Sequence, residues 1–177
     1  NETSTTSSTD GSFTIKYENG VLASLGGQDV DTQTQLDNLL LLRDLSGYSE
    51  SSFMVTPVTS VAHFMPSQDI YTVLGLDSDL DIFTTDPVAN IGDGGGYDLL
   101  YEKGNQLTVL AFALQNITNN LNTTTETTQD YFKAITEEIE KEYTETETKV
   151  DIETEAFVTK ALDNVIAAKS VTIDETA

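Results

Sequence analysis

The chain contains no cysteine, and arginine occurs only once, at Arg43. Without cysteine there can be no disulfide bond, no thiolate nucleophile and no cysteine-ligated zinc site. The absence does not identify the compartment, because many bacterial surface proteins also lack cysteine. Three kinds of chemistry are therefore excluded, while the location of the protein stays open.

Basic residues are scarce as well: 8 Lys and Arg residues stand against 30 Asp and Glu residues, which gives a formal charge of −22. A protein that binds duplex nucleic acid needs several Lys or Arg contacts to phosphate. So negative a surface repels phosphate and anionic lipid alike. No apolar run approaches the roughly 18–20 residues that cross a bilayer. The sequence therefore excludes nucleic-acid binding and membrane insertion.

Hydrophobic residues make up 38% of the chain and are interleaved with polar ones, which indicates a globular protein. A length of 177 residues suits one domain. Abundant Thr, Ser, Asp and Asn with few basic residues favour an extracellular or cell-surface location, and an ordinary acidic cytosolic protein is the alternative. The start at Asn1, in a Thr- and Ser-rich stretch without a signal peptide, is what we expect of a processed mature chain or an excised module.

Composition divides the chain into four segments, which we expect to form one compact domain. They are a polar N-terminal arm (1–11), a β-rich segment (12–55), a helical bundle (56–170) and a C-terminal strand or tail (171–177). The predicted fold class is α+β, mainly α, in which a helical bundle carries short strands from the N- and C-terminal segments.

Four short stretches have strand character. Phe13, Ile15 and Tyr17 alternate with polar residues ahead of the turn signal at 18–20, and Val21-Leu22 follows that turn. The apolar run 39–42 is ambiguous between a strand and a short helix, and its length favours a strand. At the other end of the chain Val171 and Ile173 alternate in the same way and predict an edge strand.

Capping signals locate the helices that follow. Thr56-Pro57 predicts a helix through Met65, Pro66-Ser67 a second helix ending at Gly75, and Asp86-Pro87 a third. The longest helix is predicted from Tyr97 to Leu121, with a buried seam of Leu107, Leu110, Leu114, Ile117 and Leu121.

Two further helices close the predicted bundle. One buries Tyr131, Phe132, Ile135, Ile139 and Tyr143 and turns Glu137, Glu138, Glu140 and Glu142 outward. The other begins at a Thr154 cap and carries Phe157, Val158, Ala161, Leu162, Val165 and Ile166.

The sharpest chemical signal is the acidic loop after Gly75. Asp77, Asp79 and Asp81 stand at alternate positions, as ligands 1, 3 and 5 of an EF-hand loop do, and calcium takes six to eight oxygen ligands at flexible geometry. The match ends there, because Ile82 and Val88 occupy the positions of the EF-hand glycine and glutamate. Asp86 could supply a further oxygen. The alternative is a solvated acidic turn between helices.

A second calcium candidate is Asp29 with Asp31, joined by Asp37. Two carboxylates on one side of a strand repel each other unless a cation or hydrogen-bond donors lie between them. The alternative is a turn whose aspartates cap their own backbone amides.

Catalysis has little support in the sequence. His63 is the only histidine and lies among apolar residues in a predicted helix, which is typical of a partly buried core histidine. Neither an HExxH nor a GxSxG motif occurs. Paired carboxylates are always available in a chain this acidic, so they indicate nothing by themselves. We therefore expect a protein that is not an enzyme.

Three stretches together resemble modules of large bacterial cell-surface and secreted proteins. These stretches are 26–32, 55–61, and 74–77 followed by Asp81 and 85–87. In those adhesin-like proteins a "DxDT" turn precedes a "VTPLTT" helix and an "LGL…D…DP" helix pair, often beside cadherin-like or calcium-binding repeats. The similarity spans about residues 20–120, with Val58 where leucine is usual and unusually acidic C-terminal helices. It implies an extracellular location, calcium and a non-catalytic role.

The leading hypothesis is an extracellular structural or adhesive module, calcium-stabilised, that associates with copies of itself or with another surface protein or glycan. The polar arm 1–11 and the predicted strand at Val171 favour a version in which an extended terminus pairs with a neighbour's sheet edge and builds a filament. The alternative is a carbohydrate- or peptide-binding module of a larger adhesin, which would expose aromatics such as Tyr48, Tyr71 or Tyr97. A small hydrolase built around His63 is a third hypothesis.

Overall fold

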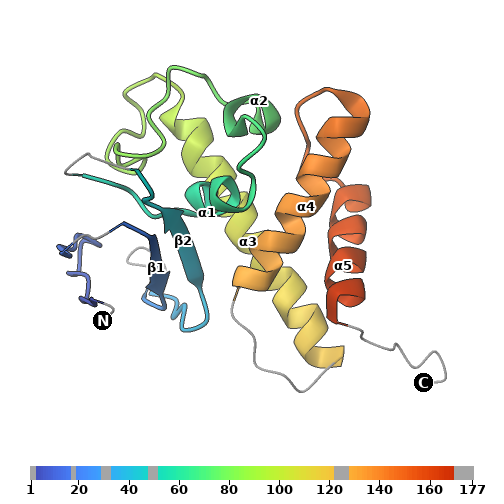
Figure 1. Ribbon diagram of the computed structural model, residues 1–177, viewed down its shortest axis with the longest axis horizontal. Helices are drawn as coiled ribbons and strands as arrows, with labels where there is room; N and C mark the ends of the chain where they lie inside the picture. Colours follow the sequence, from blue (N-terminus) through green and yellow to red (C-terminus); the bar gives the residue numbers. More distant parts are fainter. Residues whose placement is uncertain (1–2, 17–18, 29–32, 48–51, 122–127, 170–177) are drawn as a thin grey trace.

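The computed structural model describes residues 3–16, 19–28, 33–47, 52–121 and 128–169. These residues form a small two-stranded antiparallel sheet and a group of helices, which confirms the α+β, mainly α class (Figure 1). No helix among them combines the length and the apolar character that a membrane span requires. The elements are β1 (Val21–Leu25), β2 (Leu40–Asp44), α1 (Pro57–Phe64), α2 (Ile70–Leu74), α3 (Tyr97–Leu121), α4 (Gln129–Thr146) and α5 (Glu155–Lys169).

The sheet confirms two of the predicted strands. β1 and β2 pair so that Val21 lies opposite Asp44 and Leu25 opposite Leu40. On β2 the side chains alternate between the two faces, and Leu39 and Leu41 pack toward the main hydrophobic core.

The strand predicted at 13–17 is wrong over its described residues, because 13–16 join no sheet. Phe13 instead packs its ring on Phe53, with the ring centroids 5.6 Å apart. Tyr17 lies outside the described residues. This segment therefore contacts the rest of the chain through the Phe13 side chain and not through the hydrogen bonds of a sheet.

Helix α1 begins where the cap signal predicts. The Thr56 hydroxyl accepts a hydrogen bond from the Thr59 amide at 3.1 Å, and the Thr59 hydroxyl accepts one from the Thr56 amide at 2.8 Å. Two otherwise unpaired amides are thus satisfied reciprocally. α1 contacts β2 on one side and α3 and α4 on the other, so it connects the sheet to the bundle (Figure 1).

The region between α1 and α3 differs from the prediction. α2 begins at Ile70, capped by Asp69, whose Oδ1 accepts a hydrogen bond from the Tyr71 amide at 3.2 Å, and it ends at Gly75 with a φ of 69°. The helix predicted at Pro87 is wrong: residues 87–96 form successive turns. Four glycines at 92–96 have positive φ, so the chain reverses there before it can continue a helix.

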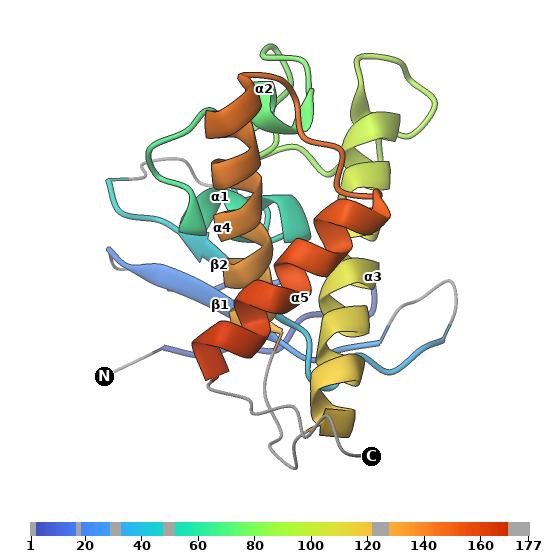
Figure 2. The ribbon, with the colours of Figure 1, turned by 90° about the vertical axis from the view of Figure 1, so that its right-hand side faces the viewer.

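Helix α4 lies at the centre of the bundle, with α5 against it on the side away from the sheet (Figure 1) and α3 alongside both (Figure 2). Its Tyr131, Phe132, Ile135 and Ile139 are fully buried, as predicted. The Tyr131 hydroxyl shares a 2.7 Å hydrogen bond with the hydroxyl of Thr118 on α3. α5 buries Phe157, Ala161 and Val165 against this core.

Two burial predictions in the bundle are wrong. Ile117 is 39% exposed, and the adjacent Thr118 faces the core in its place. Glu138 is 0% exposed although it was predicted to face solvent with its neighbouring glutamates. The side chain of Leu121 and the predicted strand at Val171 and Ile173 lie outside the described residues.

Candidate functional site

The acidic loop runs over the core as a chain of capped turns. Leu76, Leu80 and Ile82 are buried and anchor it, while Asp77 and Asp79 are exposed between Leu76 and Leu80. The Asp77 Oδ1 accepts a hydrogen bond from the Asp79 amide at 3.0 Å. Asp77 is thus used as a turn cap, the reading that the sequence left as the alternative to a ligand.

Asp81 is the most engaged carboxylate of this loop. Its Oδ1 accepts hydrogen bonds from the amides of Phe83 at 3.0 Å and Thr84 at 2.9 Å, and its Oδ2 accepts from the hydroxyls of Thr84 and Thr85. Burial raises the pKa of Asp81, but these hydrogen bonds, led by the Thr84 hydroxyl, outweigh burial and hold that pKa below its ordinary value. Since the folded-state pKa is lowered, the carboxylate stabilises the fold above its unfolded pKa of about 3.9, and this contribution is lost as the pH falls through the folded value.

Two of the remaining calcium candidates, Asp86 and Asp37, are among the described residues. Asp86 Oδ1 accepts a hydrogen bond from the Val88 amide at 2.9 Å, and Asp37 is exposed. Asp29 and Asp31 lie outside the described residues. Within the part of the chain that the structure describes, no three His, Asp or Glu side chains are grouped to hold a metal ion. Calcium binding at either site stays a prediction.

The hydrogen bonds of Asp81 predict a loss that is independent of calcium. Asp81→Ala should lower the free energy of unfolding by about 1–2 kcal/mol, the usual cost of removing a cap with several donors. The measurement is urea unfolding with added calcium and again with EDTA. Asp79→Ala, at an exposed position of the same loop, is the matched control and should change little. A loss confined to the calcium samples would show instead that Asp81 is a metal ligand.

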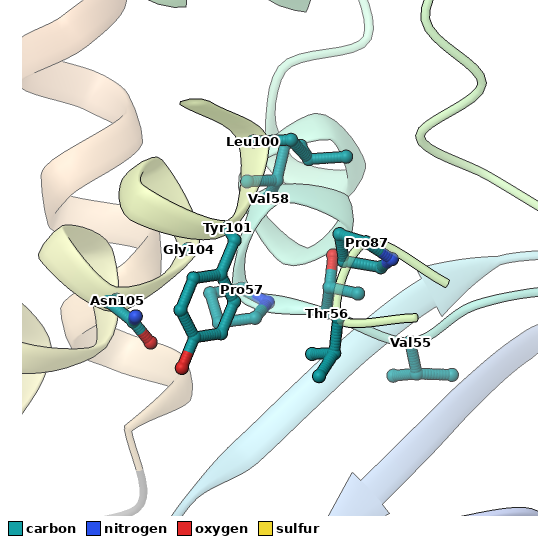
Figure 3. A pocket seen from close by; sticks show the side chains of 10 residues that line it. Val55, Thr56, Pro57, Val58, Pro87, Leu100, Tyr101, Gly104 and Asn105 are labelled. Atoms are coloured by element: carbon teal, nitrogen blue, oxygen red, sulfur yellow. The ribbon is translucent and has the colours of Figure 1, made fainter. Parts of the chain in front are cut away.

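One small pocket lies between α1, α3 and the turn at Pro87 (Figure 3). Its volume is about 160 Å³, and its lining is mostly apolar. Gly104 on α3 lies beside Pro57, and the side chains of Tyr101 and Asn105 lie along one side. Sites for drug-sized ligands have volumes of roughly 300–1,000 Å³. The pocket therefore indicates close helix packing more than a ligand site.

The residues of the catalytic and aromatic hypotheses lie apart from this pocket. His63 is half-buried, and its ring meets that of Phe64 edge-on at 4.9 Å, which fits a partly buried core histidine. Tyr71 and Tyr97 are half-buried, and burial raises the pKa of the Tyr71 hydroxyl. Tyr48 lies outside the described residues. Tyr71 and Tyr97 both pack against the hydrophobic core.

The outer edge of β1 is open toward the other described residues. The amide of Gly26 donates to the Leu39 carbonyl at 2.8 Å, and the amide of Leu45 donates to the Gly20 carbonyl at 2.8 Å. Because hydrogen-bonded and non-hydrogen-bonded pairs alternate in an antiparallel ladder, these bonds direct the backbone N–H and C=O groups of Val21, Ala23 and Leu25 away from β2. Among the described residues nothing hydrogen-bonds to those outward groups.

The side chains of the same residues are exposed too. Val21 is 53% and Leu25 64% exposed, and Ala23 between them is also exposed. The register places all three opposite Leu40, Leu42 and Asp44, on the sheet face away from Leu39 and Leu41. We call the outward backbone groups and side chains of Val21, Ala23 and Leu25 the β1 edge. The sequence predicted a strand here, but not that the strand would be an uncovered edge.

The outer edge of β2, in contrast, is closed by side-chain hydroxyls. The amide of Leu42 donates to the Ser60 hydroxyl at 2.9 Å, and the amide of Leu40 donates to the Thr128 hydroxyl at 2.7 Å. Both hydroxyls are buried, one on α1 and one at the start of α4. The sheet can therefore grow at one edge only, the β1 edge.

No family model, curated protein or solved structure was found to match the chain.

Proposed function

We propose that this protein is a non-catalytic, extracellular structural or adhesive module that associates with copies of itself through strand pairing. The observation that carries the proposal is the β1 edge. Natural proteins protect such edges with charged residues, proline, bulges or covering elements, because an open edge is a template for another strand. β1 has none of these in its sequence VLASL. An edge left so open is best understood as one that is used.

The rest of the molecule supports a structural role. The net charge of −22 keeps the surface hydrated and discourages indiscriminate contact. The Thr- and Ser-rich composition and the resemblance to bacterial surface modules support an extracellular location. In the described part of the chain the carboxylates of the acidic loop serve as turn caps, and the pocket beside Pro57 is apolar, so neither supports a catalytic role.

The N-terminal arm supports the finer version, in which extended termini build a filament. Residues 3–12 are exposed, and within the described residues their hydrogen bonds stay inside 3–16, as between the Thr3 hydroxyl and the Lys16 carbonyl at 3.1 Å. An arm with so few ties to the bundle can be exchanged at small cost to the fold.

Analytical ultracentrifugation over a range of concentrations tests the proposal. We expect concentration-dependent association of the full chain at physiological salt. In the filament version, removing residues 1–11 abolishes open-ended growth while the melting temperature is unchanged. A full chain that stays monomeric up to about 1 mM, with and without calcium, would overturn self-association and favour a carbohydrate- or peptide-binding module instead.

Calcium stabilisation is a separable part of the proposal, supported by the spacing of Asp77, Asp79 and Asp81 and by the resemblance. A metal that binds only the native state raises the melting temperature. The test is thermal unfolding of the unsubstituted chain with added calcium and again with EDTA. If its melting temperature is the same in both, calcium is removed from the proposal.

A further inference from the structure

We propose that two copies of the chain join β1 to β1 in antiparallel pairing, about a two-fold axis that passes beside Ala23, so that the two sheets become one of four strands. This inference rests on the proposed self-association and names the contact that produces it. It commits to a second copy as the occupant of the β1 edge.

The alternation of inward and outward backbone groups along β1 determines how the two β1 strands align. The outward groups belong to Val21, Ala23 and Leu25, so Ala23 lies midway between the other two. Centring the axis there pairs Ala23 with Ala23 of the second copy, and Val21 with Leu25 of the second copy. All three residues on each strand then form both hydrogen bonds of a closely spaced antiparallel pair. A shift of two residues along the strand leaves one outward residue on each copy without a partner.

The side chains fit the same register. Residues directly opposite each other in an antiparallel pair project to the same face of the sheet. Val21 therefore meets Leu25 of the second copy twice, at the two ends of the contact, and the small Ala23 side chains meet at its centre without crowding. In each copy the side chain of Val21 is 53% exposed and that of Leu25 is 64% exposed. In the dimer these side chains from the two copies form one continuous apolar row.

Charge identifies a second copy as the occupant. Two chains of −22 repel each other over most orientations. Residues 19–28, with the sequence NGVLASLGGQ, carry no charged side chain, so contact along β1 brings together two stretches that add no like charges of their own, and Asp44, opposite Val21, is the acidic residue nearest to them along the sheet. The closed outer edge of β2 removes the competing way to extend the sheet.

The first test removes one outward donor. Ala23→Pro deletes an N–H that points away from β2, a position where an edge strand tolerates proline, so the β1–β2 ladder should persist. A five-residue strand contact is small beside the roughly 1,200–2,000 Å² of a stable interface, so we expect a dimer with a micromolar to millimolar dissociation constant. Sedimentation equilibrium should show at least tenfold weaker dimerisation of the variant, with an unchanged far-UV spectrum.

A charge-reversal pair keeps the proposal testable if Ala23→Pro does not fold. The double variants Val21→Glu/Leu25→Glu and Val21→Lys/Leu25→Lys should each be monomeric when alone, because like charges then face each other across the axis. Mixed, they should form a heterodimer, because each Val21 position faces a Leu25 position of opposite charge. Val109→Glu, at a 68% exposed valine on α3, is the matched control and should dimerise like the unsubstituted chain.

The outcomes separate this inference from the proposed function. A chain that is monomeric at about 1 mM overturns both. Association that neither Ala23→Pro nor the charge variants weaken overturns the β1 contact and leaves self-association standing. An open polymer without a closed dimer overturns the two-fold contact in favour of exchange through the termini, because an isologous contact closes on itself.

Discussion

Lys160→Met is expected to lower the free energy of unfolding by about 2–4 kcal/mol, because it leaves a buried carboxylate without its interhelical cation. The Glu138 side chain is 1% exposed between α4 and α5, and the Lys160 ammonium lies 3.6 Å from its Oε1. That oxygen has no hydrogen-bond partner among the described residues, while Oε2 accepts one from the Asn164 amide group at 3.2 Å. Lys141, 3.8 Å from Oε2, remains and keeps the loss below that of a fully orphaned charge.

Lys133→Met is the matched control for this prediction. Lys133 lies 4.0 Å from Glu137 on the same helix, but the two side chains are 61% and 53% exposed. Such a surface pair contributes about 0–0.5 kcal/mol. Urea unfolding of both variants, and of Lys160→Met in a Glu138→Gln background, distinguishes charge from lost packing. An equal loss with and without the Glu138 charge would show that Lys160 stabilises the interface through its stem or through its 3.5 Å pair with Glu142, not through Glu138.

The burial of Glu138 shows where helix periodicity fails as a guide. The sequence located α4 and its inward Phe132, Ile135 and Ile139 correctly, because these positions follow the helical repeat. Glu138 lies on the flank of that stripe, and α5 covers the flank. Which flank of α4 is covered depends on how α5 crosses it, and the sequence of α4 alone does not contain that angle. All the glutamates of the run were therefore predicted to face solvent. Asn164 and Lys160, from α5, supply the polar partners that make the burial possible.

The acidic loop shows a different limit. Alternating aspartates are the same pattern whether they bind a cation or cap turns, and only the positions of the backbone amides distinguish the two. At Asp81 those amides lie within 3.0 Å of the carboxylate. Likewise, the signals Thr56-Pro57 and Asp86-Pro87 look alike, yet only the first opens a helix, because glycines follow the second too closely.

The sheet edges could not be predicted from local sequence either. β1 was expected as a strand, but its openness depends on what does not cover it. The closure of β2 depends on Thr128, which is 88 residues away from Leu40 in the chain. Hydroxyl side chains that serve as strand partners leave no recognisable spacing in a sequence. The candidate contact was therefore missed, although the absence of charge over 19–28 is a signal that could have indicated it.

The hydroxyls of Ser60 and Thr128, which accept hydrogen bonds from β2, are expected to contribute strongly to the stability of the fold. Ser60→Ala combined with Thr128→Val should lower the free energy of unfolding by about 2–6 kcal/mol, since each substitution leaves a strand amide without its acceptor at a cost of about 1–3 kcal/mol. Ser60 and Thr128 are 0% exposed, so water cannot easily replace the hydroxyls. Amide exchange of Leu40 and Leu42 should accelerate at least about tenfold, in keeping with local opening of this edge.

Thr159→Val is the matched control for these substitutions. Its hydroxyl donates to the Glu155 carbonyl at 2.8 Å on the exposed side of α5, so its loss should change stability by less than about 0.5 kcal/mol. Unchanged exchange at Leu42 in the double variant would show that helix packing, not the hydroxyls, protects the edge. Because β1 receives no hydrogen bond from either hydroxyl, association measured below the unfolding transition should stay at the unsubstituted level. Stability and self-association are then separable properties of the two edges of one small sheet.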